Sequence, residues 1–156
     1  MLPTALAAAV LALVTGTLGF RTVAHGAPAG AGPAVPRVYL AATRVELSRF
    51  LGLLAAPDQA RVRAVSFPAA VELAVFRGQV PTGGYSITVK RLTLSNRRLR
   101  IVAAFGAPGP GDIVIQVFTS PYHVVRLVRS ALGSRLPTAW SLLDTKGELV
   151  ASGAFR

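Results

Sequence analysis

The segment PTGGYSITVK, Pro81 to Lys90, joins a turn to a strand and indicates how the surrounding chain folds. Pro81 presets a turn, and the two glycines that follow Thr82 accept backbone conformations that other residues avoid. From Tyr85 onward apolar and polar residues alternate, which is the pattern of a strand with one buried face. The segment VELAVF, Val71 to Phe76, alternates in the same way before the turn. The two segments therefore predict strands connected through PTGGY.

The same period of two recurs through the rest of the chain and predicts about seven strands. A slip of the apolar phase near Lys90 and Arg91 predicts a β-bulge. The other strands are expected in RVRAVSF (61–67), RRLRIVAAF (97–105), IVIQVF (113–118), HVVRLVR (123–129) and a C-terminal hairpin that turns at Asp144 to Gly147. IVIQVF is almost continuously apolar, which predicts a central strand. Short strands between Gly, Pro and Asn turns favour a mainly β fold, an antiparallel β-sandwich or barrel.

One short helix is expected before these strands. Thr43 and Glu46 have the spacing of a capping box, which marks a helix N-terminus. Leucine and phenylalanine side chains then fall on one helical face, at Leu47, Phe50, Leu51 and Leu54. Pro57 is expected to end the helix.

The first residues predict an export signal. Leu2 to Phe20 has no charged side chain, and its apolar run ALAAAVLALV (5–14) has the length of a signal-peptide core. Residues 1–26 are therefore predicted to be a signal peptide, or alternatively an uncleaved N-terminal anchor. Residues 27–36, rich in Ala, Gly and Pro, predict a flexible tether to a single β-rich domain at 37–156. Both alternatives place the domain in a secreted, periplasmic or cell-envelope location.

The composition limits the classes of function. Seventeen Lys and Arg against six Asp and Glu give a net charge of +11. This excess fits either an arginine-rich codon usage or attraction to an acidic partner, such as an anionic envelope surface. The basic residues are scattered and the expected destination is extracytoplasmic, which argues against nucleic acid. The absence of cysteine excludes disulfides, thiolate metal sites and a cysteine nucleophile.

The residues that could carry catalysis are few. Of the two histidines, His25 falls within the predicted leader and His123 stands alone. Ser120 and His123 are too close along an extended segment to act as nucleophile and base, and no GxSxG motif precedes them. The six acidic residues show no metal-ligand spacing. We therefore expect a non-catalytic protein without metal or cofactor.

Several motifs resemble the C-terminal domain family of the protease-complex subunit PrcB. They are AVFRG (74–78), PTGGYS (81–86) and SPYHVV (120–125), and the similar region runs from Val65 to Arg129. The resemblance implies an exported accessory protein that associates with a secreted protease and stabilises it. It implies no active site.

PTGGY is also similar to a loop of chagasin-type protease inhibitors, which are immunoglobulin-like β-domains that insert this loop into a protease cleft. The inhibitors' tryptophan after the tyrosine is missing here. Two alternatives to the accessory function stay open. One is a protease inhibitor that presents the PTGGY loop, and the other is a cell-envelope-binding structural module. Two predicted protein-binding loops follow, one formed by Pro81, Thr82, Gly83, Gly84 and Tyr85, and the other by Ser120, Pro121, Tyr122 and His123. The alternative for PTGGY is a plain connection between strands.

Overall fold

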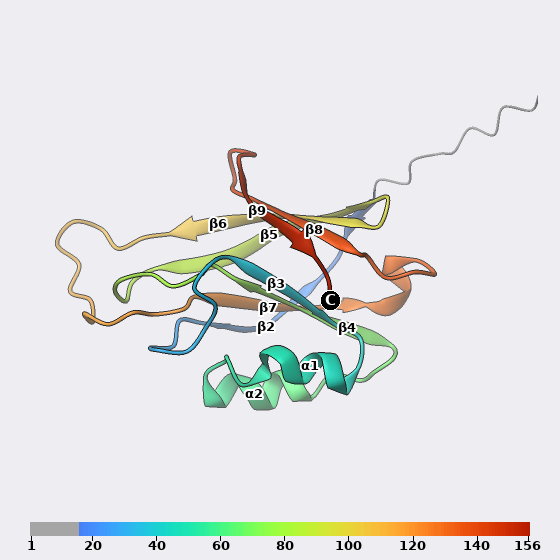
Figure 1. The fold of residues 1–156 in the computed structure, drawn as a ribbon, viewed down its shortest axis with the longest axis horizontal. Coiled ribbons are helices and arrows are strands. Elements are labelled where there is room, and N and C mark those ends of the chain that lie inside the picture. Colours follow the sequence, from blue (N-terminus) through green and yellow to red (C-terminus); the bar gives the residue numbers. More distant parts are fainter. Residues whose placement is uncertain (1–15) are drawn as a thin grey trace, which may run out of the picture.

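The computed structural model describes residues 16–156, which form two β-sheets packed face to face, with two helices on the outer face of one sheet (Figure 1). The five-stranded sheet has the order β1 (Gly16–Leu18), β5 (Ser86–Ser95), β6 (Arg98–Gly106), β8 (Ala139–Leu143) and β9 (Leu149–Ala154). The four-stranded sheet has the order β2 (Arg21–Gly26), β7 (Tyr122–Val128), β4 (Ala70–Phe76) and β3 (Arg37–Ala41). The helices are α1 (Arg44–Leu51) and α2 (Ala56–Arg63), and a 3-10 turn spans Arg129–Leu132.

The predicted mainly β, antiparallel sandwich is confirmed. All strand pairs are antiparallel except β6 and β8, and the described strands form two sheets rather than one closed barrel. The predicted bulge lies in β5, where the register with β6 shifts between Val89 and Arg91. The strands on either side of PTGGY belong to different sheets, because β4 is in the four-stranded sheet and β5 in the five-stranded sheet. PTGGY therefore carries the chain from one sheet to the other instead of closing a hairpin.

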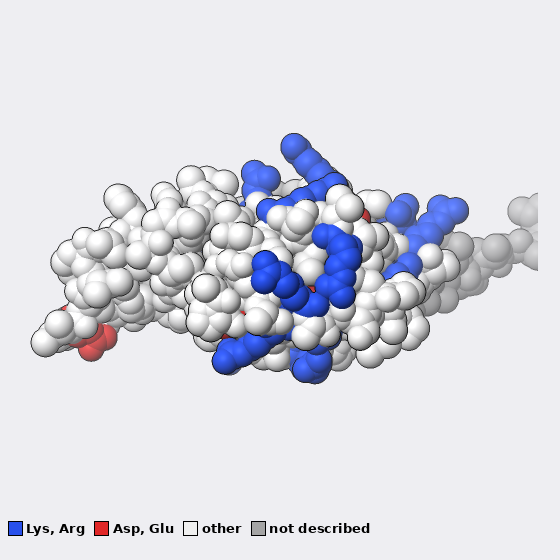
Figure 2. Space-filling model, turned by 90° about the horizontal axis from the view of Figure 1, so that it is seen from below, with Lys and Arg blue, Asp and Glu red and all other residues white. Residues whose placement is uncertain are grey.

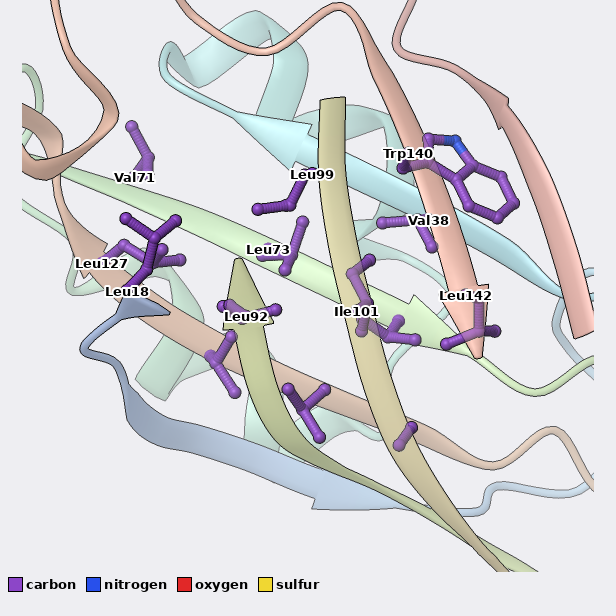
Figure 3. Packing of buried hydrophobic residues seen from close by; sticks show 14 of the residues in the cluster. Leu18, Val38, Val71, Leu73, Leu92, Leu99, Ile101, Leu127, Trp140 and Leu142 are labelled. Atoms are coloured by element: carbon purple, nitrogen blue, oxygen red, sulfur yellow. The ribbon is translucent and has the colours of Figure 1, made fainter. Parts of the chain in front are cut away.

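Apolar side chains from both sheets fill the space between them (Figure 3). Leu73 of β4 and Ile101 of β6 are fully buried there, close to the buried Trp140 of β8. A second cluster lies between the helices and the outer face of the four-stranded sheet, around Phe50, Phe76 and Tyr122. Strand β4 is therefore buried on both faces. Removing that much apolar surface from water is the main force that holds the layers together.

The helical region differs from the prediction. Thr43 does cap α1, since its hydroxyl accepts the N–H of Glu46 at 3.2 Å. The prediction that Pro57 ends this helix is wrong, because α1 already ends at Leu51. Pro57 lies in the first turn of α2 instead, where the backbone N–H that proline lacks would have no helical acceptor. The strand predicted over RVRAVSF is wrong, since Arg61 to Arg63 form the end of α2. The alternation of apolar and basic residues at 61–64 is too short to tell a strand from a helix. In α2 the buried residues are Asp58 and Val62, which are four residues apart and therefore lie on one helical face.

Residues 16–36, which precede the domain start predicted at residue 37, contact both sheets in the structure. Residues 16–26 form β1 and β2, and β2 lies beside β7 with Ala24 buried. Residues 27–36 are not a free tether, because Ala29 pairs with Thr119 and the N–H of Gln79 donates to the carbonyl of Ala34. The apolar run at 5–14 lies outside the described residues. Among residues 16–156, no helix is long and apolar enough to cross a membrane.

Candidate functional site

Two loops project together from one end of the sandwich, on the left of Figure 1. One loop contains PTGGY and spans residues 79–85, and the other spans residues 107–119 between β6 and β7. We call these two loops the apolar tip. Residues 27–36 run beside them and form hydrogen bonds with Phe118 and Ser120.

Backbone hydrogen bonds join the two loops of the apolar tip. Val80 and Thr119 exchange two N–H···O bonds of 3.0 Å, and the N–H of Gly83 donates to the carbonyl of Ile115. The hydroxyl of Thr119 donates to the carbonyl of Thr82 at 2.8 Å. Much of the PTGGY backbone is therefore used inside the tip.

The two glycines are needed for close packing. A side-chain carbon at Gly83 would lie 2.9 Å from Ile115, and one at Gly84 would lie 2.8 Å from Pro108. Gly84 also has a φ of +85°, which other residues rarely adopt. The glycines therefore build the tip, and substitutions there would change its shape as well as its surface.

The long loop exposes large apolar side chains. The strand predicted over IVIQVF is wrong, because residues 113–118 lie outside both sheets. The side chains exposed there are Ile113 (102%), Ile115 (59%), Val117 (45%) and Phe118 (62%). Four such side chains on one loop form an apolar patch that water solvates poorly, and patches of this kind mark interaction sites.

The apolar tip carries almost no charge, although the chain as a whole is strongly basic. It contains no Lys or Arg, and its one acidic residue is Asp112. The carboxylate of Asp112 accepts the N–H of Gly109 at 2.7 Å and shapes the turn. Figure 2 shows this contrast, with a protruding end on the left that carries red but no blue surface, and several blue side chains over the rest of that face.

Arg77 holds the base of the tip. Its guanidinium lies 4.9 Å from the ring centre of Tyr85 and 5.4 Å from that of Phe105. It also donates to the carbonyls of Ser86 and Gly106, where β5 begins and β6 ends. Burial lowers the pKa of Arg77 from its ordinary value. This one side chain thus ties the end of the first tip loop to the start of the second.

The second predicted binding loop, SPYH, is not a surface. Ser120, Pro121, Tyr122 and His123 are all buried. The ring of Tyr122 contacts that of Phe76. The structure therefore places the SPYH residues in the core, at the start of β7, and not on a surface loop. Pro121 and Tyr122 are apolar enough to be buried. They are covered because β7 lies between β2 and β4.

Tyr122 and His123 connect layers of the fold. The Tyr122 hydroxyl donates to the carboxylate of Asp58 and accepts the N–H of Ala55 at 3.1 Å, which ties α2 to the sheet. Burial raises the pKa of Tyr122. On the opposite face of β7, Nδ1 of His123 accepts the N–H of Val89, in the other sheet, at 2.8 Å.

The tautomer of His123 follows from these contacts. Because Nδ1 accepts a hydrogen bond, Nε2 carries the proton and donates to the hydroxyl of Thr22 at 2.9 Å. Burial, and then the nearby His25 and Lys90, lower the pKa of His123 to about 4. His123 is therefore neutral near pH 7 and has a structural function between the two sheets.

Sequence reasoning thus found one of the two tip loops. It missed Ile113 to Phe118, whose apolar run it assigned to the core. The proline and glycine residues of APGPGD (107–112) that precede this run were the available signal of a long loop. Among residues 16–156, no group of three or more His, Asp and Glu side chains could share a metal ion.

Comparison with known proteins identifies the region that contains the tip. The family model described as PrcB C-terminal matches residues 73–127, which run from β4 to β7 and include both tip loops. No curated protein and no solved structure matches the chain. The resemblance predicted from the AVFRG, PTGGYS and SPYHVV motifs is therefore confirmed, and residues 73–127 are similar to the PrcB C-terminal family.

Proposed function

We propose that this protein is an exported, non-catalytic accessory protein that binds a secreted protease through the apolar tip and stabilises it. The observation that carries the proposal is the exposed apolar loop at 113–118, rigidly joined to PTGGY and free of basic residues. The PrcB C-terminal family suggests a subunit of a protease complex, and the matched residues contain both tip loops.

The arrangement of the tip suits an interface anchor. Its exposed side chains are large and apolar, and each is worth about 1.5–3 kcal/mol when fully buried. The loops are held in place by backbone hydrogen bonds and by Arg77, so little freedom would be lost on binding. A preformed apolar tip can therefore bind a partner without a large ordering penalty.

The inhibitor alternative rests on the PTGGY loop alone. In the tip, the N–H of Gly83 and the carbonyl of Thr82 are already bonded to the neighbouring loop. Fewer backbone groups are thus free to pair with a protease cleft. Both functions would use the same end of the molecule, so the test below includes a measurement that separates them.

The test is a pull-down with the full chain as bait in the secreted and envelope fraction of the source organism, read by mass spectrometry. The tip variant is Ile113→Ser with Phe118→Ser, which changes exposed side chains and leaves the glycine packing intact. The matched control is Val45→Ser with Val128→Ser, two exposed apolar residues outside the tip. Circular dichroism verifies that both variants fold.

We expect a protease to be enriched by the wild type and the control and lost with the tip variant. Loss of two such anchors corresponds to a fall in affinity of about a hundredfold or more. Unchanged or raised proteolytic activity in the complex supports the accessory function, and suppressed activity supports an inhibitor. Equal recovery of the same partners by all three baits would contradict binding through the tip.

A further inference from the structure

A groove of about 530 Å³ lies between the outer strands of the two sheets, β3 and β9. Residues 35–40, α1, Trp140 and residues 152–156 line it, and we call it the edge groove. Figure 1 shows the C-terminal end of the chain, after β9, next to β3. None of the residues that line the edge groove falls within the family match at 73–127.

Within residues 16–156, both strands that border the edge groove have one unpaired edge. Strand β3 pairs there only with β4, and β9 pairs only with β8. An unpaired edge presents N–H and C=O groups that another extended chain can bond. The groove also offers apolar contacts, since Leu40, Trp140 and Phe155 line it and pack against the core.

The charges around the edge groove are mostly positive. Arg37, Arg49 and Arg156 line it and are exposed, and Glu46 is its one acidic residue. The carboxylate of Glu46 already accepts the N–H of Ala42 at 2.7 Å. The two ion pairs found among residues 16–156 are Arg61–Asp58 and Arg126–Glu72, so no Asp or Glu side chain pairs with Arg37 or Arg49 there. One N–H of the Arg49 guanidinium donates to the main-chain oxygen of Arg156, and its other N–H groups remain for a ligand.

We propose that the edge groove binds an extended, acidic peptide segment of a protein partner. The peptide adds as a strand to the free edge of β3, places apolar side chains against Leu40 and Trp140, and places carboxylates near Arg37 and Arg49. The chain's own residues 1–15 contain no acidic side chain, so they do not complement this groove. The site is separate from the apolar tip and does not depend on the function proposed for it.

Trp140 gives a direct measurement, because it lines the groove and is the only tryptophan in the chain. The probe is a synthetic hexapeptide of alternating valine and glutamate, blocked at both ends, titrated into the full chain while Trp140 emission is recorded. The same peptide with glutamine in place of glutamate tests the charge. A version methylated on alternate backbone nitrogens tests strand pairing.

The variant is Arg37→Gln with Arg49→Gln, and the matched control is Arg100→Gln with Arg135→Gln, two exposed arginines that do not line the groove. We expect a saturable change of emission, weakened at least about tenfold by the groove variant and by the glutamine peptide, and unchanged in the control. The methylated peptide should also bind more weakly. Thermal melts verify that the variants fold.

Three results would overturn the proposal. One is no change of Trp140 emission at about 1 mM peptide, where even weak binding is detected. Another is equal binding of the glutamate and glutamine peptides, or of the wild type and the groove variant. The third is a change of emission with protein concentration in the absence of peptide, which would assign the groove to a second copy of this chain. None of these results bears on binding through the tip.

Discussion

Replacement of His123 by alanine should destabilise the fold by about 2–4 kcal/mol, because it removes a hydrogen bond between the two sheets. The His123 side chain is only 3% exposed, and its Nδ1 accepts the N–H of Val89 at 2.8 Å. Without His123, this N–H stays in the core without a partner, which costs about 1–3 kcal/mol. The lost packing of the imidazole ring, which also contacts His25, adds to that cost.

The matched variant is His123→Asn. The Oδ1 atom of asparagine is as many bonds from Cα as Nδ1 of histidine, so it can accept the same N–H of Val89. We expect it to recover about 1 kcal/mol or more of the loss seen with alanine.

Equilibrium unfolding in urea at pH 7, followed by circular dichroism, measures these differences. The midpoint of His123→Ala should fall by about 1–2 M, and that of His123→Asn by less. A midpoint for alanine equal to that of the wild type would refute the reasoning. An asparagine variant no more stable than alanine would show that ring packing, not the hydrogen bond, accounts for the loss.

The same side chain predicts a dependence on pH. The pKa of His123 is about 4 in the folded protein and about 6.5 when unfolded, so folding favours the neutral form. The stabilisation that comes from the neutral form of His123 is therefore complete above pH 6.5. As the pH falls from 6.5 to 4 this stabilisation is lost, and the free energy of unfolding decreases by on the order of 3 kcal/mol at most. The stability difference between the wild type and His123→Asn should shrink over this range. A constant difference would contradict the neutral tautomer assigned here.

Three further perturbations follow from other contacts. Tyr122→Phe should lower stability by about 1–3 kcal/mol in a thermal melt, because the buried carboxylate of Asp58 loses its hydroxyl donor; an unchanged melt would argue against that bond. Arg126→Met should cost about 3–5 kcal/mol in urea at pH 8, where it leaves Glu72 charged and buried. Burial raises the pKa of Glu72 to about 6, so the loss should be smaller at pH 5, where this carboxyl is largely protonated, and an equal loss at both pH values would contradict this. A chain that starts at Ala27 lacks β1 and β2 and should show no cooperative unfolding; a sharp transition would show that these strands are dispensable.

The sequence by itself determined the class of fold and most of its strands. The alternation in β5, β6 and β7, the bulge after Val89 and the cap at Thr43 depend on neighbouring residues along the chain, so local pattern was sufficient to predict them. The motifs around PTGGY were likewise sufficient to predict the similarity of residues 73–127 to the PrcB C-terminal family. The pairing of residues 16–26 with the two sheets was not predictable in this way, because an apolar run that precedes a strand has the same composition as an export signal.

Only the tertiary structure decided which of the apolar segments are covered. IVIQVF and VELAVF are similarly apolar, yet β4 has a layer of protein on each face, and Ile113 to Phe118 has solvent on one side. SPYH has the composition of a turn but is buried because β7 lies between β2 and β4. The apolar composition of a segment determines how much free energy is gained when the segment is buried. The surface that buries it comes from residues far away in the sequence or from another molecule. For that reason the apolar tip, the best candidate for an interface, became visible only once the chain was folded.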